Sequence, residues 1–184
     1  MELLDIIDEN GLPTGQTVER SRAHAEGIMH RTAHVWLVRK QNNRIEILLQ
    51  KRCDTKDSFP GCYDISSAGH IPAGVDFADS AIRELKEELG IDVSEEELLF
   101  CGDRSYGWDT AFYGKPFHDR QYARVYAFLC SLSESEFRLQ EEEISSVLWM
   151  DLDEAISAVS ENTIPHCIFP EELLLVKQRV SINY

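Results

Sequence analysis

The stretch from Gly69 to Ile91 constrains the fold more than any other part of the chain, because it contains an amphipathic helix with a signal at each end. Apolar residues recur at the spacing of one helix face: Ala78, Ala81, Ile82, Leu85 and Leu89. Asp76 suits the N-cap, where a carboxylate accepts a hydrogen bond from the first turn. Gly90 suits the left-handed position that ends many helices. The sequence therefore predicts a helix between Asp76 and Gly90 that buries one face.

The other face of this helix carries three glutamates, Glu84, Glu87 and Glu88. Like charges one turn apart destabilise an isolated helix by roughly 0.2–0.5 kcal/mol, and close carboxylates raise one another's pKa. A divalent cation removes both penalties, and clustered carboxylate oxygens are the ligands that Mg²⁺ and Mn²⁺ prefer. Arg83 is placed to hold one carboxylate by a bidentate ion pair. The alternative is an ordinary helix with a solvated acidic face.

The residues around the three glutamates follow a longer pattern, made of Gly69, Arg83, Glu84, Leu85, Glu87, Glu88, Gly90 and Ile91. This pattern resembles the Nudix box, G-x5-E-x7-R-E-U-x-E-E-x-G-U with U aliphatic, at eight of its nine specified positions. The departure is Val75, where the family pattern has glutamate. Two consequences stay open: one metal ligand fewer with activity retained, or lost or altered chemistry.

The resemblance implies an α+β fold, the Nudix α/β/α sandwich with a mixed sheet. It also implies a hydrolase that cleaves a pyrophosphate bond in a nucleoside diphosphate, alone or linked to another group, with Mg²⁺ or Mn²⁺. The catalytic residues it implies are Arg83, Glu84, Glu87 and Glu88, and the metal ligands are Glu84, Glu87, Glu88 and Gly69. Glu142 and Glu143 are placed to supply a further acid, or belong to a solvated charge run.

A narrower resemblance links HAEGIMHRTAHVWLV and KRCDTKDSFPGCYDISSAGH to the Nudix branch that contains isopentenyl diphosphate isomerase. It places His24, His30 and His70 near that enzyme's metal-binding histidines. We name His30 and His70 as an additional metal or phosphate site. The isomerase needs a cysteine where this chain has Ala68, and two acids where it has Asp119 and Gln121. Proton transfer on a carbon skeleton therefore has no evident agent.

Composition narrows the classes of partner. The chain has 184 residues and a net charge of −15, which favours one soluble domain and argues against binding to nucleic acid or an anionic membrane. Five cysteines without a CxxC motif are typical of free thiols, and the acidic N-terminus lacks a secretory pattern. We expect a cytoplasmic protein with a small diphosphate substrate, and a homodimer stays open.

The rest of the chain mixes strands and helices. We expect a hairpin over residues 3–20, a connection over residues 21–31, strands over 33–39, 46–51, 63–68, 99–108, 121–130 and 147–150, a loop over 109–118, and helices over 152–159 and 171–180. The whole of residues 1–184 is expected to be one Nudix domain. Arg52, Tyr106 and Trp108 are the substrate-binding candidates, the first for phosphate and the others for a base.

The function predicted is a Nudix pyrophosphohydrolase. One alternative is a non-catalytic Nudix domain that binds a nucleotide or nucleotide sugar, which Val75 favours and the three helix glutamates oppose. Another is an isoprenoid diphosphate isomerase, which Ala68 opposes.

Overall fold

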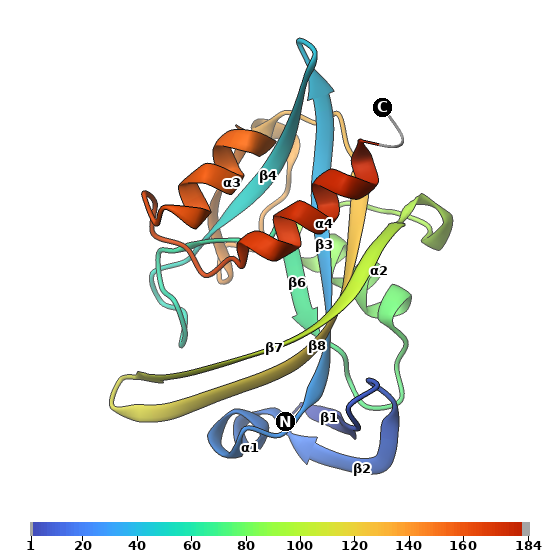
Figure 1. Ribbon diagram of the computed structural model, residues 1–184, viewed down its shortest axis with the longest axis vertical. Helices are drawn as coiled ribbons and strands as arrows, with labels where there is room; N and C mark the ends of the chain where they lie inside the picture. The colour runs from blue at the N-terminus through green and yellow to red at the C-terminus, as the bar shows by residue number, and fades with distance from the viewer. Residues whose placement is uncertain (1, 182–184) are drawn as a thin grey trace.

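The centre of the computed structural model, which describes residues 2–181, is one mixed sheet of seven strands. Residue 1 and residues 182–184 of the predicted domain lie outside the described residues. The strands are β3 (His30–Gln41), β4 (Arg44–Arg52), β5 (Tyr63–Asp64), β6 (Ser67–His70), β7 (Leu99–Phe112), β8 (Lys115–Leu129) and β9 (Ile144–Asp151). Their order is β5-β4-β3-β8-β7, while β6 pairs with β3 and β9 pairs with β4 (Figure 1). β3 and β8 are parallel and the other pairs are antiparallel.

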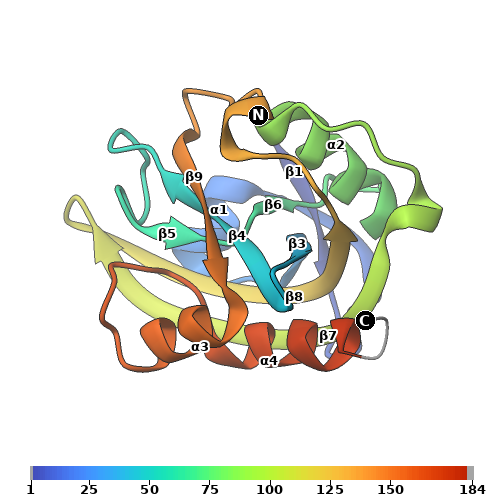
Figure 2. The ribbon, with the colours of Figure 1, turned by 90° about the horizontal axis from the view of Figure 1, so that it is seen from above.

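Helices cover both faces of this sheet (Figure 2). α2 (Phe77–Leu89) lies on one face, and α3 (Leu152–Ser160) and α4 (Pro170–Val180) lie on the other. Side chains alternate along β3 because a strand has a period of two. Val35 and Leu37 join the apolar cluster under α2, whereas Trp36 and Val38 join the cluster under α3 and α4. The predicted α+β sandwich with a mixed sheet is confirmed.

The N-terminal segment forms a separate small unit at one end of the sheet. β1 (Leu3–Ile7) and β2 (Pro13–Glu19) make the predicted hairpin. The expected connection after it contains a short helix, α1 (Arg20–Glu26), which ends at Gly27 with a φ of 68°. This helix matters for the site because it carries His24 to the start of β3.

The expected loop over residues 109–118 is wrong, because β7 and β8 continue through it as a long hairpin. Phe112 pairs with Lys115, and Tyr113 and Gly114 close the turn at φ values of 51° and 75°. Glycine, proline and polar residues suggested a loop, but Asp109 accepts hydrogen bonds from Arg120 across the strands. The hairpin reaches well beyond the body of the protein (Figure 1).

The remaining elements are close to expectation. The strand expected over residues 63–68 is divided into β5 and β6, and short 3-10 turns occupy Glu95–Glu97 and Glu134–Glu136. Among the described helices, none has both the length and the apolar character needed to cross a bilayer.

Candidate active site

The helix α2 is positioned by the capping residues that the sequence predicts. The Asp76 carboxylate accepts a hydrogen bond from the backbone N–H of Phe77 at 2.6 Å, and Gly90 ends the helix with a φ of 72°. Its apolar face, including Ala81, Leu85 and Leu89, packs into the core. The helix therefore presents Glu84 and Glu88 toward β6.

Gly69 on β6 lies directly against Glu84 on α2. A Cβ added to Gly69 would be 2.1 Å from Glu84 Oε1, so the Glu84 side chain occupies the space that any other residue would fill. Arg83 donates to Glu84 at 2.6 Å and to Glu87 at 2.9 Å. Burial is the largest cause of a raised pKa for Glu84, and the Arg83 guanidinium opposes it.

Glu87 and Glu88 have opposite environments. The Glu87 side chain is 52% exposed, whereas Glu88 is 6% exposed and receives a hydrogen bond from the backbone N–H of Ala68 at 3.3 Å. Burial raises the pKa of Glu88 to about 8; Ser67 opposes this rise, and Glu84 adds to it. A carboxyl with such a pKa is mostly neutral at pH 7 until a cation reaches it.

Val75, the residue that departs from the box, is half-buried and packs against the apolar cluster under α2. Its side chain therefore adds to the core. Asp76 beside it is occupied as the N-cap of α2.

A second group of ligands gathers on the other side of β6. Nitrogen atoms of His24, His30 and His70 all lie within 4.8 Å of one another. His24 Nε2 and His70 Nε2 are 3.2 Å apart, and Asp119 Oδ1 lies 3.6 Å from His24 Nε2 and 3.8 Å from His30 Nε2. The helix α1 and the strands β3, β6 and β8 each supply one side chain.

The histidine cluster has the chemistry of a metal centre. Burial lowers the pKa of His24 to about 3 and also lowers those of His30 and His70, which keeps the imidazoles neutral. His30 Nδ1 lies 2.8 Å from the Ile28 carbonyl, which fixes the proton there and leaves Nε2 as an acceptor. His30 Nε2 and Asp119 Oδ1 are buried and have no hydrogen-bond partner within the described residues. A cation would satisfy both atoms.

Asp119 is held in place by a short relay. Tyr106 donates its hydroxyl to Gln121 Oε1 at 2.5 Å, and the Gln121 amide donates to Asp119 Oδ2 at 2.7 Å. The other carboxylate oxygen of Asp119 is thereby directed to the histidines. Sequence reasoning left His24 and Asp119 out of the named site residues, although the isomerase-like resemblance had drawn attention to both.

The remaining candidates have protein partners. Arg52 donates to Asp64 at 2.9 Å and to the Ser58 carbonyl, so its guanidinium braces the loop before β5. Glu143 pairs with Lys56, and Glu142 is exposed and receives a thiol hydrogen bond from Cys53 through its carbonyl. The structure brings neither glutamate into the set of ligands around the histidines.

Tyr106 and Trp108 belong to a continuous group of rings. Their ring centroids lie 4.7 Å and 5.1 Å from that of Phe169, and Trp108 also contacts Phe59 at 4.8 Å. Arg104 lies over the Tyr106 ring. Three segments thus form an aromatic wall beside the histidine cluster.

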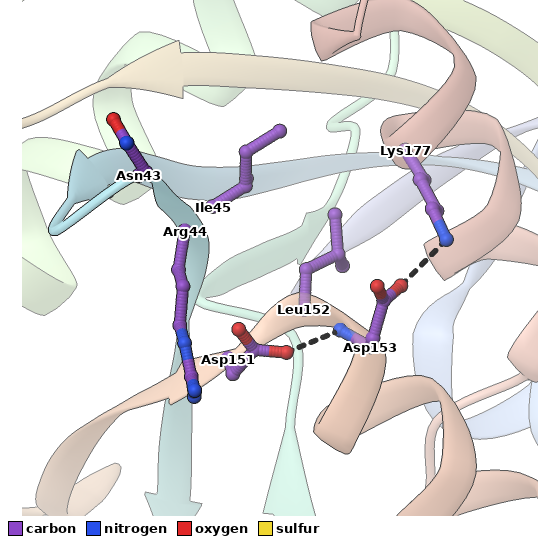
Figure 3. A pocket seen from close by; sticks show the side chains of 7 residues that line it. All are labelled: Asn43, Arg44, Ile45, Asp151, Leu152, Asp153 and Lys177. Carbon is purple, nitrogen blue, oxygen red and sulfur yellow. Dashed lines mark hydrogen bonds and ion pairs between the residues drawn. The ribbon is translucent and has the colours of Figure 1, made fainter.

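A pocket of about 440 Å³ lies at the other end of β3 (Figure 3). Its lining residues are Asn43, Arg44, Ile45, Asp151, Leu152, Asp153 and Lys177. Asp153 and Lys177 pair with each other, and the Asp151 carboxylate caps α3. The carboxylates of Asp151 and Asp153 and the amine of Lys177 already have protein partners. This pocket is therefore a weaker candidate for a functional site than the two groups beside β6.

Comparison with known proteins identifies the family of this chain. The family described as the NUDIX domain matches residues 29–179. The chain belongs to the Nudix family. It is 35% identical over 153 residues to an uncharacterized Nudix hydrolase of Clostridium acetobutylicum, covering 83% of this chain and 71% of that protein. It is 33% identical over 192 residues to Nudix hydrolase 3 of Arabidopsis thaliana, covering 99% of this chain and 24% of that protein.

Solved structures show the same Nudix fold at low sequence identity. DR0079 of Deinococcus radiodurans has a TM-score of 0.68 at 17% identity and covers 96% of this chain and 98% of its own. The Nudix domain of Shewanella oneidensis NrtR complexed with ADP ribose has a TM-score of 0.55 at 16% identity, with coverages of 84% and 88%. An Ap4A hydrolase binary complex from C. elegans has a TM-score of 0.55 at 21% identity, with coverages of 82% and 97%.

Proposed function

We propose that this Nudix protein is a metal-dependent pyrophosphohydrolase that cleaves a diphosphate bond in a nucleoside diphosphate or its derivative. The observation that carries the proposal is the contact between Gly69 and Glu84, with Glu88 buried one turn further along α2. Family membership and relatives named as hydrolases support it. The match to the Arabidopsis protein covers 24% of its length, and the rest of that protein lies outside the match.

The box residues have distinct roles in this proposal. Mg²⁺ or Mn²⁺ held by Glu84, Glu87, Glu88 and the Gly69 carbonyl would neutralise charge on the phosphate oxygens. Arg83 holds Glu84 and Glu87 in fixed orientations by its two short ion pairs. Glu88 would lose its own proton to become a ligand, or would accept a proton from water once it is ionised, since its raised pKa lies near neutral pH.

The histidine cluster is proposed as a second centre, on the opposite side of residues 68–70. Imidazole ligands suit first-row transition metals, so Mn²⁺ fits this cluster better than Mg²⁺. His30 and His70 would be ligands, with His24 and Asp119 completing the set. Such an ion also offers a contact for a substrate phosphate. The same convergence supports the isomerase-like branch of the family.

The aromatic wall is proposed to bind the nucleoside. ADP ribose, bound by one structural neighbour, is a nucleoside diphosphate linked to a sugar, which belongs to the proposed class. Tyr106 and Trp108 offer ring faces for stacking. Arg52 is the weaker part of this proposal because its donors already bond Asp64 and Ser58.

Two other functions are alternatives to the hydrolase. Isomerisation needs a proton donor and acceptor on carbon, and Ala68 and Gln121 supply neither a thiol nor an acid. A non-catalytic nucleotide-binding domain is the second candidate, favoured by Val75, which removes one carboxylate from the box.

The deciding experiment measures phosphate and nucleotide release from nucleoside diphosphates, nucleotide sugars, dinucleoside polyphosphates and coenzyme A, with Mg²⁺ and then Mn²⁺. We expect metal-dependent cleavage of one class, lost in Glu88→Gln. Cleavage of none of them, together with thermal stabilisation by one ligand, would replace the hydrolase by the binding function.

A further inference from the structure

The N-terminal segment precedes residues 29–179, which match the NUDIX domain, yet it packs directly on the Nudix box. Leu4 forms a bridge with Pro72, and the backbone N–H of Ala73 donates to the Leu3 carbonyl at 2.8 Å. The strand β1 therefore runs beside residues 71–76, which join β6 to α2. This connection, which we call the box loop, sets the position of the metal-binding helix relative to Gly69.

Asp5 on β1 is the charged residue in this contact. Its Oδ2 accepts a hydrogen bond from the Gly74 backbone N–H at 2.9 Å and another from Arg31 Nη2 at 2.9 Å. The same Arg31 nitrogen donates to the Val75 carbonyl at 3.0 Å. Asp5 and Arg31 are 9% and 8% exposed, so water screens these contacts little. Asp5 thus anchors the box loop at the residue where the box departs from its pattern.

The surroundings of position 75 fit a replacement of the glutamate of the family pattern by the carboxylate of Asp5. Val75 faces the apolar cluster, and the guanidinium of Arg31 already touches its carbonyl. Arg31 Nε is buried and has no hydrogen-bond partner within the described residues. Position 75 thus lies beside the Arg31 guanidinium through its backbone carbonyl, and in this chain Asp5 pairs with that guanidinium from another strand.

We propose that Asp5 is a positioning residue that supplies, from the N-terminal hairpin, the anchoring carboxylate that the Nudix box lacks at Val75. It holds the box loop against β1 and β3, and thereby keeps Glu84 on α2 against Gly69 on β6. The inference rests on the proposed function, because the geometry it protects matters only where the α2 carboxylates bind metal. A buried ion pair adds little net stability over apolar residues. The role of the Asp5–Arg31 pair here is to hold the box loop in one conformation.

The test begins with Asp5→Asn, which keeps the size of the side chain and removes its charge. Two readouts are used: Mg²⁺ affinity by calorimetry and hydrogen exchange of the box loop without metal. Mg²⁺ prefers oxygen ligands, which keeps the histidine cluster out of the measurement. We expect affinity to fall about tenfold, as for other partners that orient metal ligands, and box-loop amides to exchange faster.

Rescue separates positioning from general stability. Val75→Glu added to Asp5→Asn should restore Mg²⁺ affinity to within about threefold of the starting protein, whereas Val75→Gln should restore nothing, because only the charged side chain pairs with Arg31. Val75→Glu alone should leave the affinity unchanged, since an increase there would mean that the new carboxylate binds the metal itself. Asp8→Asn is the matched control, since Asp8 also accepts backbone N–H bonds in the hairpin but lies in its turn. Asp5→Glu keeps the charge and serves if Asp5→Asn does not fold, with an expected affinity loss of less than tenfold.

The outcomes are distinct from those of the proposed function. Unchanged Mg²⁺ affinity and unchanged exchange in folded Asp5→Asn would overturn the inference, as would equal rescue by Val75→Glu and Val75→Gln. A lower melting temperature with unaltered affinity would assign Asp5 a structural role only, and would overturn it too. Failure of the unmodified protein to hydrolyse any substrate would count against the proposed function, while the affinity and exchange data would still decide the role of Asp5.

Discussion

Glu88 is the residue at which burial and chemistry conflict most directly. Its carboxyl has a pKa of about 8 because of burial, so a metal ion at pH 7 must displace a proton. We expect Mn²⁺ or Mg²⁺ affinity to rise as the pH increases toward 8, by up to about tenfold per unit, and then to level off. Calorimetric titration at several pH values measures this slope. Glu88→Gln should abolish it, whereas Glu87→Gln should keep it because Glu87 is half exposed. An equal slope in both variants would contradict this account.

A second residue-scale case is Glu172, which is fully buried on the first turn of α4. It accepts hydrogen bonds from His34 at 3.0 Å, Trp36 at 2.8 Å and Arg104 at 3.2 Å. Burial alone would raise its pKa, but these donors, His34 foremost, lower it below the usual value. Between the lowered pKa of Glu172 in the folded protein and its ordinary pKa, the unfolded chain therefore binds more protons than the folded protein. The contribution of Glu172 to stability is fully present above the ordinary pKa and is lost as the pH falls through the lowered pKa.

Glu172→Gln should lower the free energy of unfolding at pH 7 by about 3–5 kcal/mol, because it leaves Arg104 and His34 without their carboxylate. The difference between the two proteins should shrink as the pH falls below 4. Urea unfolding at pH 7, 5 and 3.5 measures both effects. Glu171→Gln is the control, since its side chain is exposed beside Glu172. A constant difference at all three pH values would refute the assigned linkage.

The sequence predicted the ends and the buried face of α2 well. It predicted poorly which side chains from distant segments lie together. Capping and apolar spacing are local, so Asp76, Gly90 and the three box glutamates were placed correctly on α2. The opposite burial of Glu87 and Glu88 depends on how α2 rotates against β6, which no local pattern contains. His24 joins the histidine cluster because α1 forms in a segment that lacks a clear helix signal. Asp119 joins it because β8 begins six residues before the predicted start of its strand, at Lys115.

At the scale of elements, the contact between β6 and α2 sets the position of Glu84 relative to Gly69. The space beside Gly69 is filled by the Glu84 side chain, whose Oε1, Cδ and Cγ atoms would lie 2.1, 2.3 and 2.6 Å from an added Cβ. Gly69→Ala should therefore displace Glu84 and weaken metal binding about tenfold or more. Mg²⁺ calorimetry combined with thermal unfolding tests this. Gly74→Ala is a useful comparison, since nothing lies within 4 Å of an added Cβ there although its φ of 78° adds strain. A large loss of stability with intact metal binding would show that Gly69 serves packing alone.

The β7–β8 hairpin shows where element-scale prediction fails. Its outer half reads as a loop from Asp109 to His118 because glycine and proline interrupt the pattern. Cross-strand pairs compensate, since Trp108 faces Asp119 and Asp109 faces His118 in the observed register. The strand was therefore specified by its partner strand and by ring contacts with Phe59 and Phe169, which are distant in sequence.

At the scale of the whole molecule, two proposed ligand sets flank one short strand. Glu84 on α2 approaches Gly69 from one side of β6, and His70 joins the histidine cluster on the other. The first set offers oxygen atoms and the second mostly nitrogen, so the two should differ in metal preference. This division would also explain how a chain with a net charge of −15 could bind the proposed anionic substrate, because bound cations would offset the local charge.

We therefore expect two Mn²⁺ ions per chain at saturation, and one tightly bound ion when Mg²⁺ is the sole metal. His30→Asn should remove one Mn²⁺ and leave Mg²⁺ binding unchanged, because His30 belongs only to the nitrogen-rich set. Glu84→Gln combined with Glu88→Gln should remove the other Mn²⁺ and abolish Mg²⁺ binding. Elemental analysis of dialysed protein and calorimetry count the ions, and His166→Asn is the control because His166 is half-buried beside β5 and lies outside the histidine cluster. A single Mn²⁺ that either change removes would mean that the two sets hold one shared ion, and the division across β6 would then be wrong.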